Sequence, residues 1–158
     1  MNGTPEPGSA PEATTEPTSY APDAARLRSI FEDARTIAVV GLSSRPDRPS
    51  YGVSAYMQEQ GYRIVPVNPN ETEILGETVY PSLLDVPKDV RVDIVDVFRR
   101  AELTPPVARD AVRVGAKVLW LQEGIVNDDA RRIAEDAGLT VIMGACIRVV
   151  HGWIEGRD

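Results

Sequence analysis

The folded part of this sequence is dominated by five short apolar runs that alternate with segments of helical character. The runs are rich in β-branched residues and cover residues 36–42, 62–67, 92–98, 116–122 and 139–143. Continuous apolar runs of this length are typical of strands that are buried on both faces of a parallel sheet. Because strands alternate with helices, we predict right-handed βαβ units and an α/β fold, in which a doubly wound, mainly parallel sheet carries helices on both faces.

Capping residues indicate where the intervening helices begin and end. Asp23 is an N-cap candidate for a first helix that places Leu27, Ile30 and Phe31 at helical spacing. Three further helices are expected between a capping or helix-opening residue and a glycine, at Ser50 to Gly61, Thr104 to Gly115, and Asn127 to Gly138. A short extra strand is expected near residues 78–80.

Residues 1–22 consist mostly of Pro, Thr, Ser, Ala, Glu and Gly and offer almost nothing to bury. We predict a disordered tail there and one folded domain at 23–158. The formal net charge is −7, of which three charges come from glutamates of the tail, so the domain carries about −4. A balance of this sign argues against nucleic acid as a partner, because phosphate backbones require a basic surface.

Cys146 is the only cysteine, which excludes an internal disulfide and a cysteine-based metal cage, so no metal site is expected. The sequence contains no apolar run near the roughly 20 residues that span a bilayer, and its first residues lack the features of a signal peptide. These features favour a cytoplasmic protein without a membrane partner.

In doubly wound sheets, ligands bind beyond the carboxyl ends of the strands, at the switch point of the strand order. The first predicted strand leads into 41–52, GLSSRPDRPSYG, which occupies the position of a phosphate loop without the GxGxxG pattern. Helix-start amides and the hydroxyls of Ser43, Ser44 and Ser50 are suited to holding a phosphate, and Arg45 and Arg48 add positive charge. The alternative is a solvated loop, but a long loop at a switch point is usually functional.

Two further strand ends bear on the ligand. The second strand ends in Asn68-Pro69, where an NAD-binding domain would have Asp or Glu, although an Asn-Pro turn alone would explain the pattern. The third ends in Phe98-Arg99-Arg100, which is either solvated surface or, with the two loop arginines, part of a cationic edge for a polyanion.

The last strand ends contain no complete catalytic constellation. Glu123, in Gln122-Glu123-Gly124, is expected at a turn or ligand contact rather than as a general base, since no partner acid is evident. Cys146 and His151 would point roughly 140° apart on a helix and form a poor nucleophile–base pair. Cys146 is therefore either a small buried hydrophobe or a ligand-facing thiol, and His151 is expected to have a structural or surface role.

Several stretches together resemble a known family: VVGLSSRPDRPSYGV, GYRIVPVNPNE, LGETVYPSL, VDIVDVFRR, GAKVLWLQEGIVN and residues 146–151. From about residue 23 to 153 the chain resembles the stand-alone CoA-binding proteins, relatives of the CoA-binding domain of the succinyl-CoA synthetase α subunit. The resemblance implies a Rossmann-like fold with coenzyme A at the switch point. The synthetase also needs a domain with a phosphorylated histidine, so its ligase activity does not carry over.

The resemblance also assigns residues to the coenzyme. It implies that Gly41, Ser43, Ser44 and Arg45 lie against the phosphates, Asn68 and Pro69 beside the nucleotide, Phe98 and Arg99 along the coenzyme, Gln122, Glu123 and Gly124 near it, and Cys146 towards its thiol. With Arg48, Ser50 and Tyr51 of the first loop, these residues form the predicted coenzyme site.

The leading hypothesis is therefore a protein that binds CoA or acyl-CoA and is not an enzyme by itself. Two alternatives stay open: an NADP- or nucleotide-dependent enzyme that uses the same edge, and a CoA-binding subunit that becomes active only with a partner chain.

Overall fold

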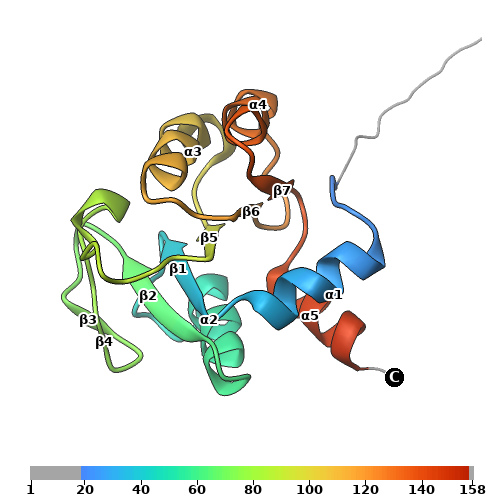
Figure 1. Cartoon of the computed structure of the whole chain (residues 1–158). Coiled ribbons are helices and arrows are strands. Elements are labelled where there is room, and N and C mark those ends of the chain that lie inside the picture. The colour runs from blue at the N-terminus through green and yellow to red at the C-terminus, as the bar shows by residue number, and fades with distance from the viewer. Residues whose placement is uncertain (1–18, 157–158) are drawn as a thin grey trace, which may run out of the picture.

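The computed structural model describes residues 19–156, which form one five-stranded, fully parallel sheet (Figure 1). The strand order is β2 (Arg63–Val67), β1 (Thr36–Val40), β5 (Ile94–Val97), β6 (Val118–Leu121) and β7 (Thr140–Ile142). The chain first proceeds from β1 to β2 and then crosses to β5 on the other side of β1, so the strand order switches between β1 and β5. This arrangement confirms the predicted Rossmann-like α/β fold. In folds of this kind, ligands bind beyond the carboxyl ends of the strands at such a switch point.

Helices cover both faces of the sheet (Figure 1). One face carries α1 (Ala24–Asp33), α2 (Pro49–Glu59) and α5 (Ile147–Glu155), and the other carries α3 (Thr104–Arg113) and α4 (Asp128–Asp136). The α5 helix was not among the helices predicted from the sequence. Short elements complete the fold: the β3 (Glu73–Ile74) and β4 (Glu77–Thr78) hairpin, and 3₁₀ turns at Leu83–Asp85 and Ala101–Leu103.

Two predicted N-caps are confirmed and one is wrong. The side chains of Asp23 and Asn127 accept hydrogen bonds from backbone amides in the first turns of α1 and α4. Ser50 does not cap α2, because that helix begins at Pro49 and has Arg48 at its N-cap position. Proline suits the first position of a helix, since its fixed φ is already helical and its missing N–H would have no intrahelical partner there.

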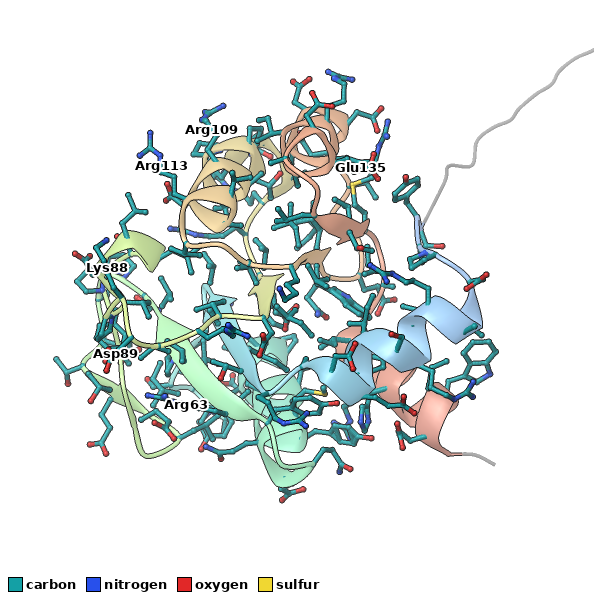
Figure 2. The ribbon with its side chains drawn as sticks, viewed as in Figure 1. Arg63, Lys88, Asp89, Arg109, Arg113 and Glu135 are labelled. Atoms are coloured by element: carbon teal, nitrogen blue, oxygen red, sulfur yellow. The ribbon has the colours of Figure 1, made fainter. Side chains whose placement is uncertain are left out.

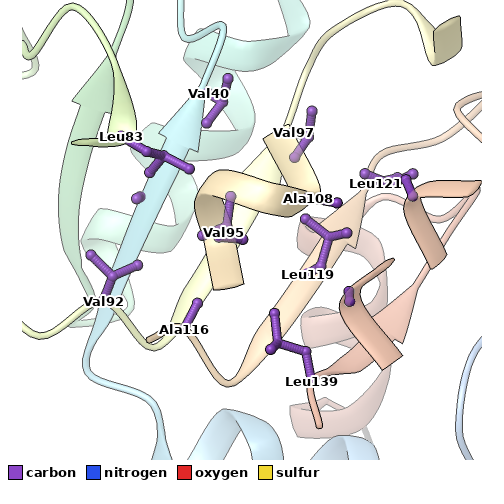
Figure 3. Packing of buried hydrophobic residues seen from close by; sticks show 14 of the residues in the cluster. Val40, Leu83, Val92, Val95, Val97, Ala108, Ala116, Leu119, Leu121 and Leu139 are labelled. Atoms are coloured by element: carbon purple, nitrogen blue, oxygen red, sulfur yellow. The ribbon is translucent and has the colours of Figure 1, made fainter. Parts of the chain in front are cut away.

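The two faces of the sheet bury separate apolar clusters. Against α3 and α4, the sheet presents Val95, Val97 and Leu119, and small side chains such as Ala108 let α3 approach closely (Figure 3). On the opposite face, Trp120 is the largest fully buried side chain. Close packing on both faces makes the sheet a rigid frame, from which the loops at its carboxyl edge project.

Tyr20, which precedes the predicted domain boundary at residue 23, contacts the folded domain. Tyr20 and Met143 exchange two backbone hydrogen bonds of 2.8 Å, and the Tyr20 hydroxyl donates to Glu135 over 2.7 Å. Glu135 lies on α4 beside this segment (Figure 2). The predicted disorder of residues 1–18 concerns a segment outside the described residues. Within the described residues, no helix is both long and apolar enough to cross a membrane.

Candidate functional site at the carboxyl edge of the sheet

At the switch point, the backbones of Gly41 and Phe98 lie close together; these two residues follow β1 and β5. Phe98 N–H donates to the Val40 carbonyl and Gly41 N–H donates to the Val67 carbonyl, both over 2.9 Å. Gly41 has a φ of +90°, and a Cβ atom placed on it would lie 2.4 Å from the Phe98 carbonyl oxygen. The backbone after β1 runs so close to the end of β5 that only glycine fits at position 41.

Side-chain hydrogen bonds hold the loop that follows Gly41. Ser43 N–H donates to Ser50 Oγ over 3.0 Å, and Arg45 N–H donates to Ser43 Oγ over 3.1 Å. From the neighbouring strand end, Asn68 Nδ2 donates to the Leu42 carbonyl over 2.9 Å. Ser50 is buried, so its hydroxyl anchors the loop to the first turn of α2. The loop therefore has a defined shape in front of a helix N-terminus, which is a favourable position for an anion.

Glu71, which follows the second strand end shortly after Asn68 and was not among the predicted site residues, contacts the first loop. The Ser44 hydroxyl donates to its carboxylate over 2.8 Å. Asn68, by contrast, uses both ends of its amide internally, because its Oδ1 accepts the Asn70 N–H over 2.8 Å while its Nδ2 holds the first loop. An acidic side chain therefore lies three residues after Asn68, within hydrogen-bonding distance of the first loop. In the sequence, the position of Glu71 just beyond the Asn-Pro turn was the signal that pointed to this contact.

The arginines of the predicted cationic edge are exposed after β1 and β5, and two of them form ion pairs. Arg45 pairs with Asp47 at 3.2 Å, and Arg100 pairs with Glu102 at 3.8 Å. These side chains are all more than 60% exposed, so the ion pairs are weak. Arg48 and Arg99 are also exposed and form no ion pair within the described part of the chain.

The end of β6 places a buried polar side chain beneath this edge. Gln122 is 3% exposed and donates through Nε2 to the carboxylate of Asp96, while its Oε1 accepts the Ile147 N–H over 3.4 Å. Burial raises the pKa of Asp96 to about 7, and the hydrogen bond from Gln122 partly opposes the rise. Because its amide is committed on both sides, Gln122 positions other groups, whereas Glu123 and Gly124 beyond it are exposed.

Cys146 and His151 lie at different places on α5. Cys146 is the half-buried N-cap residue, next to the carboxyl edge. His151 is buried on the inner side of the helix, with Nδ1 3.1 Å from the Tyr56 hydroxyl and its ring edge-on to Phe31. Burial lowers the pKa of His151. These contacts agree with the structural role that the sequence predicts for His151.

Of the remaining predicted site residues, Tyr51 is half-buried in the first turn of α2 and Pro69 is exposed after β2, so both lie at the same edge. A cavity of about 380 Å³ lies elsewhere, where Ser29 of α1 meets Arg91 and Lys117 before β5 and β6. It belongs to the opposite, amino edge of the sheet and contains no predicted site residue.

Comparison with known proteins agrees with this geometry. Residues 35–152 match the CoA binding domain family. The chain is 46% identical over 130 residues to Uncharacterized protein YneT of Bacillus subtilis, an alignment that covers 82% of the chain and 95% of that protein. A hypothetical protein from Pyrococcus horikoshii has a solved structure with a TM-score of 0.83 and 34% identity, covering 92% of this chain and 99% of that one.

Parts of larger enzymes match as well. The chain is 37% identical over 135 residues to the α subunit of acetate–CoA ligase (ADP-forming) II of Pyrococcus furiosus, and the alignment covers 77% of this chain but only 28% of that subunit. For the acetate–CoA ligase (ADP-forming) II of Archaeoglobus fulgidus, the identity is 33% over 111 residues, with 69% of this chain and 16% of that protein covered. Because the match covers residues 35–152, the chain belongs to the CoA binding domain family, and its relatives include a protein of similar length and segments of ADP-forming acetate–CoA ligases.

Proposed function

We propose that the chain binds coenzyme A, free or acylated, at the carboxyl edge of its sheet and carries out no chemistry by itself. The observation that carries this proposal is the held loop between Gly41 and Ser50. Hydrogen bonds from Asn68 and to Ser50 define its shape in front of α2, and two exposed arginines project from it. Such a loop can accept a pyrophosphate without first becoming ordered, so little binding energy is lost to conformational entropy.

The charge of the coenzyme fits the basic residues at this edge. CoA carries a pyrophosphate and a 3′-phosphate, and Arg45, Arg48 and Arg99 are exposed beside the loop and after β5. In a chain of net charge −7, these cations are the groups that would attract a polyanion locally. Family membership supports the same ligand, since the relatives with named activities are ligases that act on CoA.

Glu71 keeps a second candidate open. An acid that follows the second strand commonly binds the ribose hydroxyls of NAD, and Glu71 approaches the first loop through Ser44. A dinucleotide would therefore find part of its usual recognition pattern here. Ligation would need more than this chain, because the chain corresponds to only 28% of the related ligase subunit. Catalysis, if it occurs, is therefore proposed to need a partner chain.

Calorimetric titration with CoA, dephospho-CoA, NAD and NADP separates these functions. We expect CoA to bind more tightly than NAD, and removal of the 3′-phosphate to weaken binding. Arg45→Ala should weaken CoA binding about 10-fold, since one charge-assisted hydrogen bond of about 1.4 kcal/mol corresponds to that factor. The loss should shrink at high salt, because exposed charges are screened.

Arg63→Ala is the matched control. Arg63 is an exposed arginine at the amino end of β2, on the opposite edge of the sheet (Figure 2). Its removal changes the net charge by the same amount and should leave CoA affinity nearly unchanged. Tight binding of NAD or NADP with no heat from CoA would overturn the proposal and favour the dinucleotide alternative.

A further inference from the structure

A line of buried hydrogen bonds connects the middle of the sheet to the start of the last helix. Asp96 of β5 accepts from Gln122, which follows β6, and Gln122 in turn accepts from the backbone N–H of Ile147, the first residue of α5. The three residues are 1%, 3% and 0% exposed, respectively. Because all three are buried, water cannot replace a hydrogen-bond partner unless the structure opens locally. The protonation or orientation of one group therefore constrains the hydrogen bonds of the others.

The carboxyl of Asp96 has an apolar setting. In the sheet register, Asp96 lies between Val39 of β1 and Trp120 of β6, both of them buried. The groups that stabilise its charge are the Gln122 amide and the backbone N–H of Val97. Among the described residues, no ionisable side chain of β1, β6, α2 or α5 acts on that charge. The protonation state of Asp96 is therefore coupled to Gln122 more directly than to any other side chain.

The orientation of the Gln122 amide depends on that protonation state. A carboxylate can only accept hydrogen bonds, so it holds Nε2 of Gln122 towards itself and leaves Oε1 for the Ile147 N–H. A protonated carboxyl gains an O–H donor but keeps one acceptor oxygen. When the proton lies on the oxygen that faces Gln122, the amide must turn so that its Oε1 accepts that hydrogen. If the amide turns to accept that hydrogen, Nε2 faces the Ile147 N–H, and two donors oppose each other where a hydrogen bond had been. A buried donor without a partner is costly, so the first turn of α5 would loosen.

We propose that Asp96 and Gln122 form a proton-linked switch, which holds the first turn of α5 and its N-cap residue Cys146 against the carboxyl edge only while Asp96 is ionised. The switch needs no ligand, whereas its effect on CoA affinity rests on the function proposed above. Since burial brings the pKa of Asp96 to about 7, both states would be populated near neutral pH. The acid form would present a looser α5 terminus to the ligand site.

Nuclear magnetic resonance between pH 5.5 and 8.5 tests the switch in the unmodified full chain, without ligand. We expect the Asp96 carboxyl carbon, the Gln122 side-chain amide and the Ile147 backbone amide to titrate with one common midpoint. The hydrogen-exchange protection of Ile147 should fall several-fold on the acid side of that midpoint, after correction for the intrinsic exchange rate. An Asp96 carboxyl that titrates while Gln122 and Ile147 stay unchanged would overturn the proposal, as would an Asp96 that remains ionised down to pH 5.5.

His151 requires a control, because it lies on the same helix and can titrate in the same range. It is the only histidine in the chain, so its ring resonances report its titration without overlap. In Asp96→Asn the pH dependence of Ile147 should disappear while that of His151 persists. If the Ile147 signal followed His151 in that variant, the helix and not the Asp96 carboxyl would be the source, and the proposal would fail.

Calorimetry with CoA at pH 6 and pH 8 then links the switch to the site. Weaker binding at pH 6 in the wild-type chain, with a smaller pH effect in Asp96→Asn, is the expected result. Absence of CoA binding at either pH would contradict the proposed function but leave the ligand-free titration unaffected, so the two failures can be told apart. If CoA affinity changed equally with pH in the wild type and in Asp96→Asn, the regulatory part of the proposal would be contradicted.

Discussion

Gly41→Ala should be among the most destabilising glycine-to-alanine substitutions in this chain. Two costs combine at this position. The φ of +90° is unfavourable for any residue with a Cβ atom, and about 1–2 kcal/mol is a reasonable figure for that cost alone. The added Cβ would also lie 2.4 Å from the Phe98 carbonyl oxygen, a distance at which one of the two backbones must move.

The second cost is large because the contact is between two backbones. Phe98 is held by its N–H bond to Val40, so relief of the overlap stretches the junction between β1 and β5. We expect Gly41→Ala to lower the free energy of unfolding by about 3–5 kcal/mol, the range of severe core substitutions. For a domain of this size, that corresponds to a fall in Tm of roughly 10 °C or more.

Gly138→Ala separates the two costs. Gly138 has a φ of +94°, nearly the same as that of Gly41, but nothing lies within 4 Å of where its Cβ would be. It should therefore show the conformational cost alone, about 1–2 kcal/mol. Urea denaturation of both variants, followed by circular dichroism, gives the comparison. If Gly41→Ala cost no more than Gly138→Ala, the close approach would not constrain the switch point, and the reasoning would be refuted.

Other measurements test separate features. Deleting residues 1–18 should leave Tm nearly unchanged, whereas deleting residues 1–22 should lower Tm measurably, because the second deletion removes the Tyr20 bonds to Met143 and Glu135. Equal Tm values for the two deletions would show that the Tyr20 bonds do not contribute to stability. Asp96 binds a proton more tightly in the folded chain, with a pKa of about 7, so its contribution to stability should decline as pH rises from about 4 to about 7. Asp96→Asn should remove that decline. Relative to the wild type, the free energy of unfolding of the variant should therefore rise between pH 5 and pH 8, by at most about 3 kcal/mol, because the interval from pH 5 to the pKa of about 7 spans two pH units; a parallel pH profile would contradict this. Burial lowers the pKa of His151, so its contribution has the opposite sign and stability should be lost as pH falls below about 6.5; a titration of the histidine ring above that value would exclude this assignment.

The sequence predicts the strands well because each is buried on both faces and therefore apolar along its whole length. Asp23 and Asn127 were recognisable as caps because their bonds are local. The prediction of Ser50 as an N-cap was wrong because its hydroxyl accepts from the Ser43 N–H of the preceding loop and not from an amide of its own helix. The partner of a serine hydroxyl cannot be told from the sequence. The α5 helix escaped prediction because it follows the last strand without a conventional side-chain cap and is rich in β-branched residues.

The candidate site could be located from the sequence, but the bonds within it could not. Alternation of strands and helices places Gly41 and Phe98 at strand ends, and strand ends at a switch point are where ligands bind. The hydrogen bonds from Ser44 to Glu71, from Gln122 to Asp96 and from Ile147 to Gln122 connect residues 25 to 27 positions apart. Such pairs depend on strand order and register, which local patterns do not encode. Asp96 was noticeable only as an unexpected charge in a buried run.

Both outer edges of the sheet are obstructed by single residues from outside it. At β7, Tyr20 uses the backbone groups of Met143 just beyond the strand. At β2, Tyr80 donates to the Pro66 carbonyl and accepts from Asn68, and Pro66 itself has no N–H to offer a neighbouring strand. Exposed strand edges are templates on which a second chain can add its own strand, so these residues protect the sheet against intermolecular pairing. We therefore expect loss of the Tyr20 bridge to expose backbone groups at this edge and to reduce resistance to aggregation as well as stability.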